Sequence, residues 1–334
     1  MSVKIRNIEL NHGIMLAPMA GYTDRAMRRI CRDYGCEYSV TEMVSAKAVV
    51  YDDKKTFSLA KILPDEGPVS IQIFGSEPEI MAEAADRLSH PEAGAPPVAI
   101  DVNMGCPVHK IFSNGEGSAL MRSPTQIEKI VSAIKKRTTL PVTVKLRSGI
   151  DEKSINAIDC ALAAEAGGAD MICLHGRTRV QMYGGKSDRK IIKNVKNALH
   201  IPLFANGDIT SADAAVSMFS ETGADGIAIG RGAVGNPFLF EEIISKLTGK
   251  PQRNIEITER AEVALHQLRL AIEDKGERAA IPEARKQIAL YLHGFRGAAQ
   301  LRAKINLATT YQEVEIAFAE AVRENKANSE FGTR

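Results

Sequence analysis

One cysteine in this sequence stands where its thiol could do chemistry, between a glycine and a proline in the segment Asp-Val-Asn-Met-Gly-Cys-Pro, residues 101–107. The apolar run 98–100 precedes this segment, which predicts that Cys106 lies on a tight loop at the end of a buried strand. A thiol with an ordinary pKa of ~8.5 stays mostly protonated at neutral pH and can donate a proton. The alternative is a structural role, because free cysteines are commonly small buried hydrophobic residues.

Other polar residues also follow short apolar runs, where predicted strands end. They are Gln72, Asn103, Lys145, Arg147, His175, Arg177, Arg179, Asn206, Asp208 and Arg231. Any one of them could satisfy a buried network, and Lys145 could simply pair with Asp101 or Glu42. Together they indicate a site, because the active sites of (β/α)₈ barrels lie at the carboxyl ends of the strands.

Two glycine-containing segments, 206–208 and 230–232, resemble a phosphate grip. Gly207 and Gly230 let backbone N–H groups approach a ligand closely, and a helix start is predicted at Asn236. Residues 230–235 also match GxGxxG, but they follow the last predicted strand and no βαβ unit comes after them. A dinucleotide fingerprint is therefore disfavoured.

The elements that must position these residues alternate along the chain. Continuous apolar runs predict eight strands, at residues 14–18, 38–43, 69–74, 98–103, 142–146, 171–175, 203–206 and 226–230. Ser76 and Ser123, each with Glu or Gln three residues later, predict capping boxes at two helix starts. We therefore expect an α/β fold, a (β/α)₈ TIM barrel, with an open doubly wound sheet as the alternative.

The connection after the fourth predicted strand is unusually long. Asn103 and Lys145 are 42 positions apart, whereas Gln72 to Asn103 and Lys145 to His175 span 31 and 30. The surplus lies in residues 105–121, which include Cys106. Long loops in compact domains are commonly functional, so this loop is expected to belong to the site.

Strand signals end near residue 245. We expect a catalytic barrel over 1–244, a small helical domain over 245–327 with helices at 257–275, 282–308 and 311–325, and a disordered tail over 328–334. Within the helical domain six cations face Glu283 as the only anion of the cluster: Arg278, Arg285, Lys286, Arg296, Arg302 and Lys304. Such a group is either a solvated face or a docking surface for a polyanion.

Composition limits the remaining function classes. The 334 residues carry a net charge of only +2, so nucleic-acid binding would need a local patch. Aromatic residues make up 5% and tryptophan is absent, which disfavours stacking along an extended single strand. Five cysteines form no CxxC pair, so reduced thiols in the cytoplasm and no metal site are expected. No apolar run approaches ~18 residues and no signal peptide is evident, which predicts no membrane association.

Seven segments, in order along the barrel, together resemble the tRNA-dihydrouridine synthases, most closely the bacterial B-type branch. They are LAPMAG at 16–21, QIFG at 72–75, DVNMGCP at 101–107, VKLR at 144–147, LHGRT at 174–178, ANGD at 205–208 and IGR at 229–231. A weaker similarity to the helical tRNA-binding region of the family covers 291–302.

The resemblance implies that FMN lies across the carboxyl end of the barrel. Its cofactor-binding residues would be Pro18, Met19, Ala20, Gln72, Lys145, His175, Asn206, Gly207, Asp208, Gly230 and Arg231. A cation such as Lys145 can stabilise negative charge on a reduced flavin.

The resemblance further implies that NADPH reduces the flavin and that a uridine in the tRNA D-loop is reduced at its C5=C6 bond. Cys106 would donate the proton, and Asn103, Arg147 and Arg177 would line the uracil pocket. Among the cations of the helical domain, Arg285, Lys286 and Arg302 are the predicted tRNA contacts, and a monomer is expected.

Three other functions remain open from the sequence. An FMN barrel could reduce a small pyrimidine or enoate, and the helical domain would then be dispensable. A non-catalytic RNA-binding protein would use only the basic helices. A phosphosugar isomerase would share the phosphate grip but leave Cys106 and Lys145 without a purpose.

Overall fold

A computed structural model of the chain describes residues 2–331, with side chains for residues 2–326. Within this part, eight parallel strands pair in a ring that closes where β11 returns to β3. They are β3 (Ile14–Leu16), β4 (Tyr38–Val40), β6 (Val69–Phe74), β7 (Ala99–Asn103), β8 (Val142–Arg147), β9 (Met171–His175), β10 (Leu203–Asn206) and β11 (Gly226–Ile229). The two-residue strand β5 (Val44–Ser45) adds to β6. The predicted (β/α)₈ barrel is confirmed, and the open sheet is wrong.

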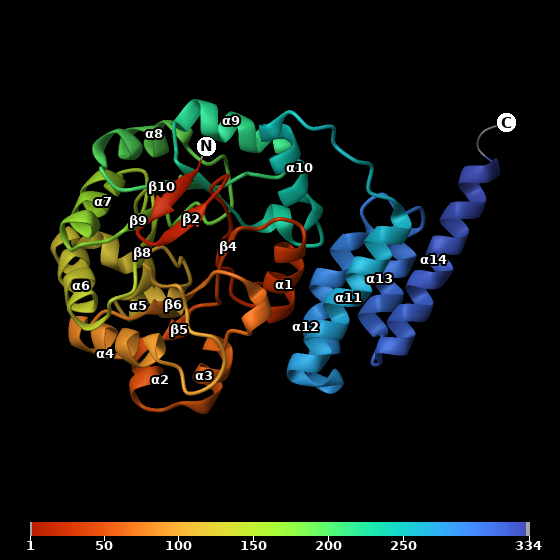
Figure 1. The fold of residues 1–334 in the computed structure, drawn as a ribbon, viewed down its shortest axis with the longest axis horizontal. Coiled ribbons are helices and arrows are strands. Elements are labelled where there is room, and N and C mark those ends of the chain that lie inside the picture. Colours follow the sequence, from red (N-terminus) through yellow and green to blue (C-terminus); the bar gives the residue numbers. More distant parts are fainter. Residues whose placement is uncertain (1, 332–334) are drawn as a thin grey trace.

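Helices surround the barrel (Figure 1). They are α1 (Arg25–Asp33), α2 (Ala46–Val50), α3 (Lys54–Ala60), α4 (Pro78–Ser89), α6 (Pro124–Arg137), α7 (Ala157–Ala166), α8 (Arg189–Ala198), α9 (Ala212–Thr222) and α10 (Phe238–Thr248). The long fourth connection contains α5 (His109–Ser113) and the 3-10 helix η2 (Gly117–Arg122); the other 3-10 turns of the barrel are η1 (Pro64–Glu66) and η3 (Arg231–Ala233).

The predicted helix starts are only partly correct. Ser123 caps α6, because its side chain accepts a hydrogen bond from the backbone N–H of Gln126. The predicted capping box at Ser76 is wrong: Glu77 is the cap residue of α4 and makes no side-chain cap bond. The amide of Gln126 donates instead to the backbone oxygen of Ser76 at 2.8 Å and ties the two helix starts together.

An amino-terminal hairpin was not expected from the sequence. It consists of β1 (Val3–Ile5) and β2 (Ile8–Leu10), whose inward residues join the cluster of side chains inside the barrel. Arg6 lies 3.9 Å from Asp170, which directly precedes β9. The hairpin therefore closes the amino end of the barrel and leaves the carboxyl end for the polar residues.

The carboxy-terminal part is helical and has its own hydrophobic cluster. It contains α11 (Ile257–Lys275), α12 (Glu277–Ile288), the 3-10 turn η4 (Ala289–Leu292), α13 (Ala298–Leu307) and α14 (Tyr311–Phe331). In Figure 1 these helices stand beside the barrel, next to α1. Two ion pairs, Arg25 with Asp274 and Lys275 with Asp24 at 2.8 Å, join the two parts.

Three predicted boundaries differ from the structure. The division at 244/245 falls inside α10, which packs on α9 and so belongs to the barrel. The single helix expected over 282–308 is two, α12 and α13, since Gly294 and Gly297 have positive φ between them. Helix α14 continues through 328–331, where disorder was expected, because no glycine or proline interrupts residues 311–331. Residues 332–334 lie outside the described residues.

Candidate active site

The strand register brings the predicted polar residues to one end of the barrel. Asn103 of β7 is level with Lys145 of β8. Arg147, at the end of β8, is level with His175, which is level with Asn206 of β10. Five residues from four neighbouring strands thus share the carboxyl end of the sheet.

A buried chain of hydrogen bonds leads from a carboxylate to the cysteine loop. Gln72 donates to Asp101 at 2.6 Å and accepts from the amide of Asn103 at 2.9 Å. The side-chain oxygen of Asn103 in turn accepts a hydrogen bond from the backbone N–H of Cys106 at 2.9 Å. Burial raises the pKa of Asp101 to about 6, although hydrogen bonds from Thr143 and Gln72 oppose the rise. The sequence indicated Asp101 only as a possible partner of Lys145.

The thiol of Cys106 lies in a confined position. The residue is 8% exposed, and burial raises the pKa of its thiol, while the charges of Arg147 and Lys145 act in the opposite direction. The hydroxyl of Ser118 donates to the backbone oxygen of Cys106 at 2.7 Å. A Cβ atom at Gly117 would lie 3.0 Å from that of Cys106, so the loop needs glycine there. The net effect is a thiol that keeps its proton at neutral pH.

Arg147 contacts the backbone of two loops. Its Nε donates to the oxygen of Gly105 at 2.9 Å, and its Nη1 donates to those of Thr178 and Met182 at 2.8 and 3.0 Å. Burial lowers the pKa of Arg147 to about 10, so the guanidinium stays charged at neutral pH. The sequence gave no signal for these carbonyl partners, because they depend on how the loops fold.

Lys145 lies between the middle of the barrel and the predicted phosphate grip. Its ammonium group donates to the side-chain oxygen of Asn206 at 3.0 Å. Asn206 is fixed in turn by its own amide, which donates to the oxygen of Ala228 at 2.7 Å. Burial lowers the pKa of Lys145, and the charge of Arg147 adds to this effect. Lys145 thus binds Asn206, and the alternative prediction of an ion pair with Asp101 or Glu42 is wrong.

His175 is held neutral beside several cations. Burial, followed by the charges of Lys145, Arg147 and Arg177, lowers the pKa of His175 to about 2. Its Nε2 lies 3.4 Å from Nη1 of Arg177. Since a neutral imidazole nitrogen accepts a hydrogen bond from a guanidinium, the proton of His175 is expected on Nδ1.

Arg177 is 2% exposed and is held by its own loop and by Asp208. It donates to the oxygens of Gly184 and Gly185 at 2.9 and 2.7 Å and pairs with Asp208 at 2.8 Å. Burial alone would raise the pKa of Asp208, but the backbone N–H of Ser187 and the charge of Arg177 outweigh it and hold that pKa low. Its carboxylate is thus already engaged within the protein.

Two glycines allow loops at the carboxyl end of the barrel to approach each other closely. A Cβ atom at Gly230 would lie 3.4 Å from the sulfur of Met19, in the loop after β3. At Gly207, which has φ +122, it would lie 2.4 Å from the hydroxyl of Ser187. Pro18 and Ala20 flank Met19 in the same loop, where Ala20 is exposed. The side chain of Arg231 extends over the ring of Tyr183, 4.4 Å from its centre.

The three predicted tRNA contacts of the helical part differ in their surroundings. Arg285 donates through Nε to the oxygen of Ala308, at 3.1 Å, beyond the end of α13. Lys286 is exposed and reaches the barrel, with its ammonium nitrogen 4.5 Å from the ring centre of Tyr22. Arg302 is exposed on α13.

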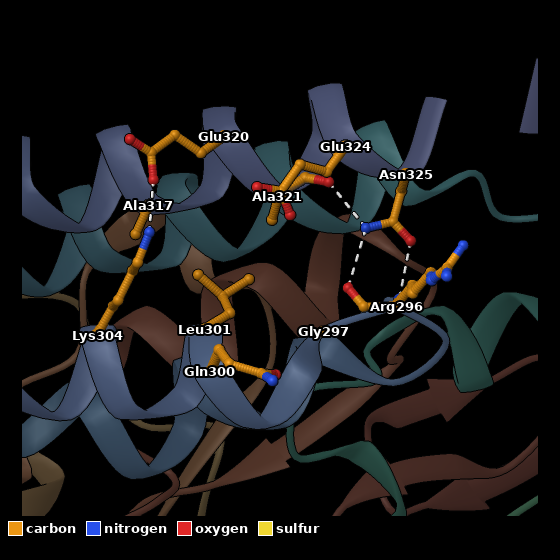
Figure 2. Close-up of a pocket in the computed structure, with 10 residues that line it drawn as sticks. All are labelled: Arg296, Gly297, Gln300, Leu301, Lys304, Ala317, Glu320, Ala321, Glu324 and Asn325. Carbon is orange, nitrogen blue, oxygen red and sulfur yellow. Dashed lines mark hydrogen bonds and ion pairs between the residues drawn. The ribbon is translucent and has the colours of Figure 1, made fainter. Parts of the chain in front are cut away.

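A groove of about 580 Å³ lies between α13 and α14 (Figure 2). Lys304 from the predicted basic cluster pairs across it with Glu320 at 2.7 Å. The side chain of Asn325 accepts from the backbone N–H of Arg296 at 2.8 Å. An ion pair therefore connects the two helices across the groove, and the carboxylate of Glu320 compensates the charge of Lys304 there.

None of the helices in the described part, residues 2–331, combines the length and the apolar character that a membrane crossing requires.

A closed barrel that gathers a buried thiol, a lysine and a histidine at the carboxyl ends of its strands defines the class of (β/α)₈-barrel enzymes. Residues 15–327 match the model of one family, described as dihydrouridine synthase (Dus). The chain belongs to the dihydrouridine synthase family. Membership confirms the predicted family and the prediction of an oxidoreductase that reduces uridine in tRNA.

The relatives match along nearly the whole chain. A tRNA-dihydrouridine synthase B of Shewanella oneidensis is 38% identical over 326 residues, which are 96% of this chain and all of the relative. A probable tRNA-dihydrouridine synthase of Rickettsia bellii is 38% identical over 307 residues, covering 91% and 93%.

Solved structures show the fold at much lower identity. A histamine dehydrogenase from Rhizobium sp. 4-9 has a TM-score of 0.55 and 13% identity, covering 86% of this chain and 50% of its own. An amine oxidase for 6-hydroxypseudooxynicotine from Pseudomonas geniculata N1 has a TM-score of 0.57 and 13% identity, covering 74% of this chain. This chain spans about half the length of either, and the likeness concerns the barrel fold alone.

Proposed function

We propose that this protein reduces the C5=C6 bond of a uridine in the D-loop of tRNA, with bound FMN as cofactor and NADPH as reductant, and that Cys106 is its catalytic acid. The observation that carries the proposal is the thiol itself. It is buried, protonated at neutral pH and lies beside Lys145 and Arg147 at the carboxyl end of the barrel.

The residues present fit a flavin. A flat ring with carbonyl groups on one edge needs a donor beside it, and the ammonium group of Lys145 is suitable. A phosphate needs approachable backbone and a cation; Gly207, where no Cβ is tolerated, and the exposed Arg231 supply them. Pro18, Met19, Ala20, Gln72, His175, Asn206, Asp208 and Gly230 complete the proposed cofactor site.

When bound, the flavin supplies a hydride to C6 of uracil, which leaves C5 in need of a proton. Cys106 donates that proton from its thiol and is restored by solvent. The chain of hydrogen bonds through Asn103 to Asp101 holds the loop that carries the thiol. Asn103 and Arg177 are proposed to contact the base.

The target base must leave its stack to reach a buried thiol, so the RNA has to be held at the barrel mouth. Lys286 is the proposed link, because it is exposed on α12 and reaches the loop after β3. Arg302 is the other proposed contact, whereas Arg285, which was predicted to be one, donates to the backbone oxygen of Ala308 and is proposed to hold the end of α13 instead. We propose that the protein works as a monomer in the cytoplasm.

The test combines a spectrum with an assay. The purified protein should be yellow, release FMN on denaturation, and form dihydrouridine in unmodified tRNA with NADPH, as measured by mass spectrometry of digested RNA. Deletion of residues 257–334 should abolish the reaction on tRNA. A colourless protein, or a truncated protein that still turns over a free pyrimidine efficiently, would contradict the proposal.

A further inference from the structure

The loop between β9 and α8 exposes three large apolar side chains to solvent. Val180, Met182 and Tyr183 are 55%, 46% and 54% exposed. On the loop that carries the cysteine, Val108 is 48% exposed, two residues after Cys106. We call these four residues the apolar rim. Several large exposed apolar side chains on neighbouring loops are uncommon on a folded protein and commonly mark a binding surface.

The apolar rim lies beside Cys106 because two contacts join its loops. The guanidinium of Arg147 binds the backbone oxygens of both Gly105 and Met182. This one side chain therefore connects the residue before Cys106 to the rim. In addition, the guanidinium carbon of Arg179 lies 3.6 Å from the ring centre of Phe112, which belongs to α5 of the cysteine loop.

Hydrogen bonds to the backbone of the loop after β9 fix the orientation of these exposed side chains. Val180 donates its N–H to the oxygen of Ile150 at 3.0 Å, and Arg177 holds the oxygen of Gly184. Met182 has φ +48, a left-handed conformation that is strained for a residue with a Cβ unless its surroundings hold it there. The hydrogen bond from Arg147 to the backbone oxygen of Met182 holds this conformation. The rim is therefore preorganised and outward-facing.

The rim also carries a cation. Arg231, whose side chain is 56% exposed, stacks on Tyr183 with its guanidinium carbon 4.4 Å from the ring centre. An exposed aromatic ring backed by a guanidinium is a surface on which proteins stack unpaired bases.

We propose that the apolar rim binds the nucleobases that flank the target uridine, with Tyr183 as the stacking residue. The inference rests on the proposed function. When the uridine enters the site, its neighbours each lose a stacking partner, and their apolar faces are left beside Cys106. The rim supplies replacement contacts there, so it favours the RNA conformation in which the uridine is turned out.

A double-mutant cycle tests this with tRNA transcripts that lack the base on the 5′ or the 3′ side of the mapped target uridine. Base stacking is worth about 1–3 kcal/mol, so Tyr183→Ala should raise KM for intact tRNA about tenfold. One of the abasic transcripts should impose a comparable rise on the wild-type enzyme but little further rise on Tyr183→Ala. Tyr183→Phe keeps the ring, and Tyr51→Ala removes a tyrosine that is 77% exposed after α2; both should behave as wild type.

Several outcomes would overturn the inference. Equal penalties for the abasic transcripts in wild type and Tyr183→Ala would show that the rim does not touch these bases. A loss that appears equally in flavin reduction by NADPH without tRNA would assign Tyr183 to the nicotinamide. If Tyr183→Ala fails to fold, Val180→Ser serves in the same cycle, and absence of coupling there overturns the rim. Wild-type inactivity on every tRNA would instead overturn the proposed function.

Discussion

The side chain of Arg147 donates to the backbone oxygen of Gly105 at 2.9 Å, directly before Cys106. The same guanidinium holds two carbonyls of the loop after β9. Its partners in the structure are thus backbone oxygens of two active-site loops, which differs from the uracil contact that the family resemblance implies. Arg147 fixes where the thiol stands relative to the next loop.

Replacement of Arg147 should therefore loosen both loops even without RNA. Hydrogen bonds from a charged donor contribute about 1.5–3 kcal/mol each, so Arg147→Met should increase amide deuterium exchange at least about tenfold in residues 105–116 and 178–184. Hydrogen exchange mass spectrometry of the protein alone measures this. Arg147→Lys, which keeps the charge but not the three-way geometry, should show most of the same increase. Unchanged exchange together with a raised KM for tRNA would indicate a substrate contact instead.

Lys145 should set the reduction potential of the bound flavin. Its charge favours negative charge on a nearby ring, so Lys145→Met should retain the cofactor and make the midpoint potential more negative. Lys145→Arg should lie between the two. Spectroelectrochemical titration gives the potentials, and a Lys145→Met protein with the wild-type potential would place the ammonium group away from the ring.

His175 should make the protein less stable in acid. Its folded pKa of about 2 lies below its ordinary value of 6.5, so its contribution is fully present above pH 6.5 and is lost as the pH falls toward 2. Between pH 7 and pH 5 the unfolding free energy of the wild type should drop about 2 kcal/mol more than that of His175→Gln. Asp101, with a pKa raised to about 6, has the opposite trend but is common to both proteins.

Urea denaturation at the two pH values measures this difference. His90→Gln, which changes a histidine with an 80% exposed side chain, serves as the control and should follow the wild type. A wild type and His175→Gln with the same pH dependence would mean that His175 is not held neutral in the folded protein.

The cations of the helical part should separate into two kinds. Lys286→Ala and Arg302→Ala should each weaken tRNA binding and reduce the slope of log Kd against log salt by about 0.7–0.9. Arg285 already donates to Ala308, so Arg285→Ala should leave that slope unchanged and lower the melting temperature. Filter binding at several salt concentrations, with thermal melts of each variant, makes the comparison. A slope that changes only for Arg285→Ala would reverse the assignment.

The sequence predicted the barrel because its signals are local. Each buried strand is a short apolar run, and the end of that run fixes where Gln72, Asn103, Lys145 and His175 must lie once the ring closes. The hairpin before β3 was not predicted because its strands alternate buried apolar residues with the exposed Lys4 and Glu9 and so form no continuous apolar run.

What the sequence could not supply were contacts between loops. The carbonyl partners of Arg147 and the stacking of Arg231 on Tyr183 join residues that are distant in the chain, through backbone geometry that no residue pattern encodes. Likewise, six cations in the helical part looked alike in sequence, whereas Lys304 is paired with Glu320. Residue type predicted charge, and only the fold determined its partner.

The buried thiol of Cys106 is proposed to supply the proton to C5 of uracil. Mixing the flavin-reduced protein with unmodified tRNA, and following dihydrouridine in single turnover by mass spectrometry, tests this role most directly. Cys106→Ala should bind FMN and tRNA as the wild type does and form dihydrouridine about 10²–10⁴ times more slowly, the usual contribution of a general acid. Formation at the wild-type rate by Cys106→Ala would contradict the claim.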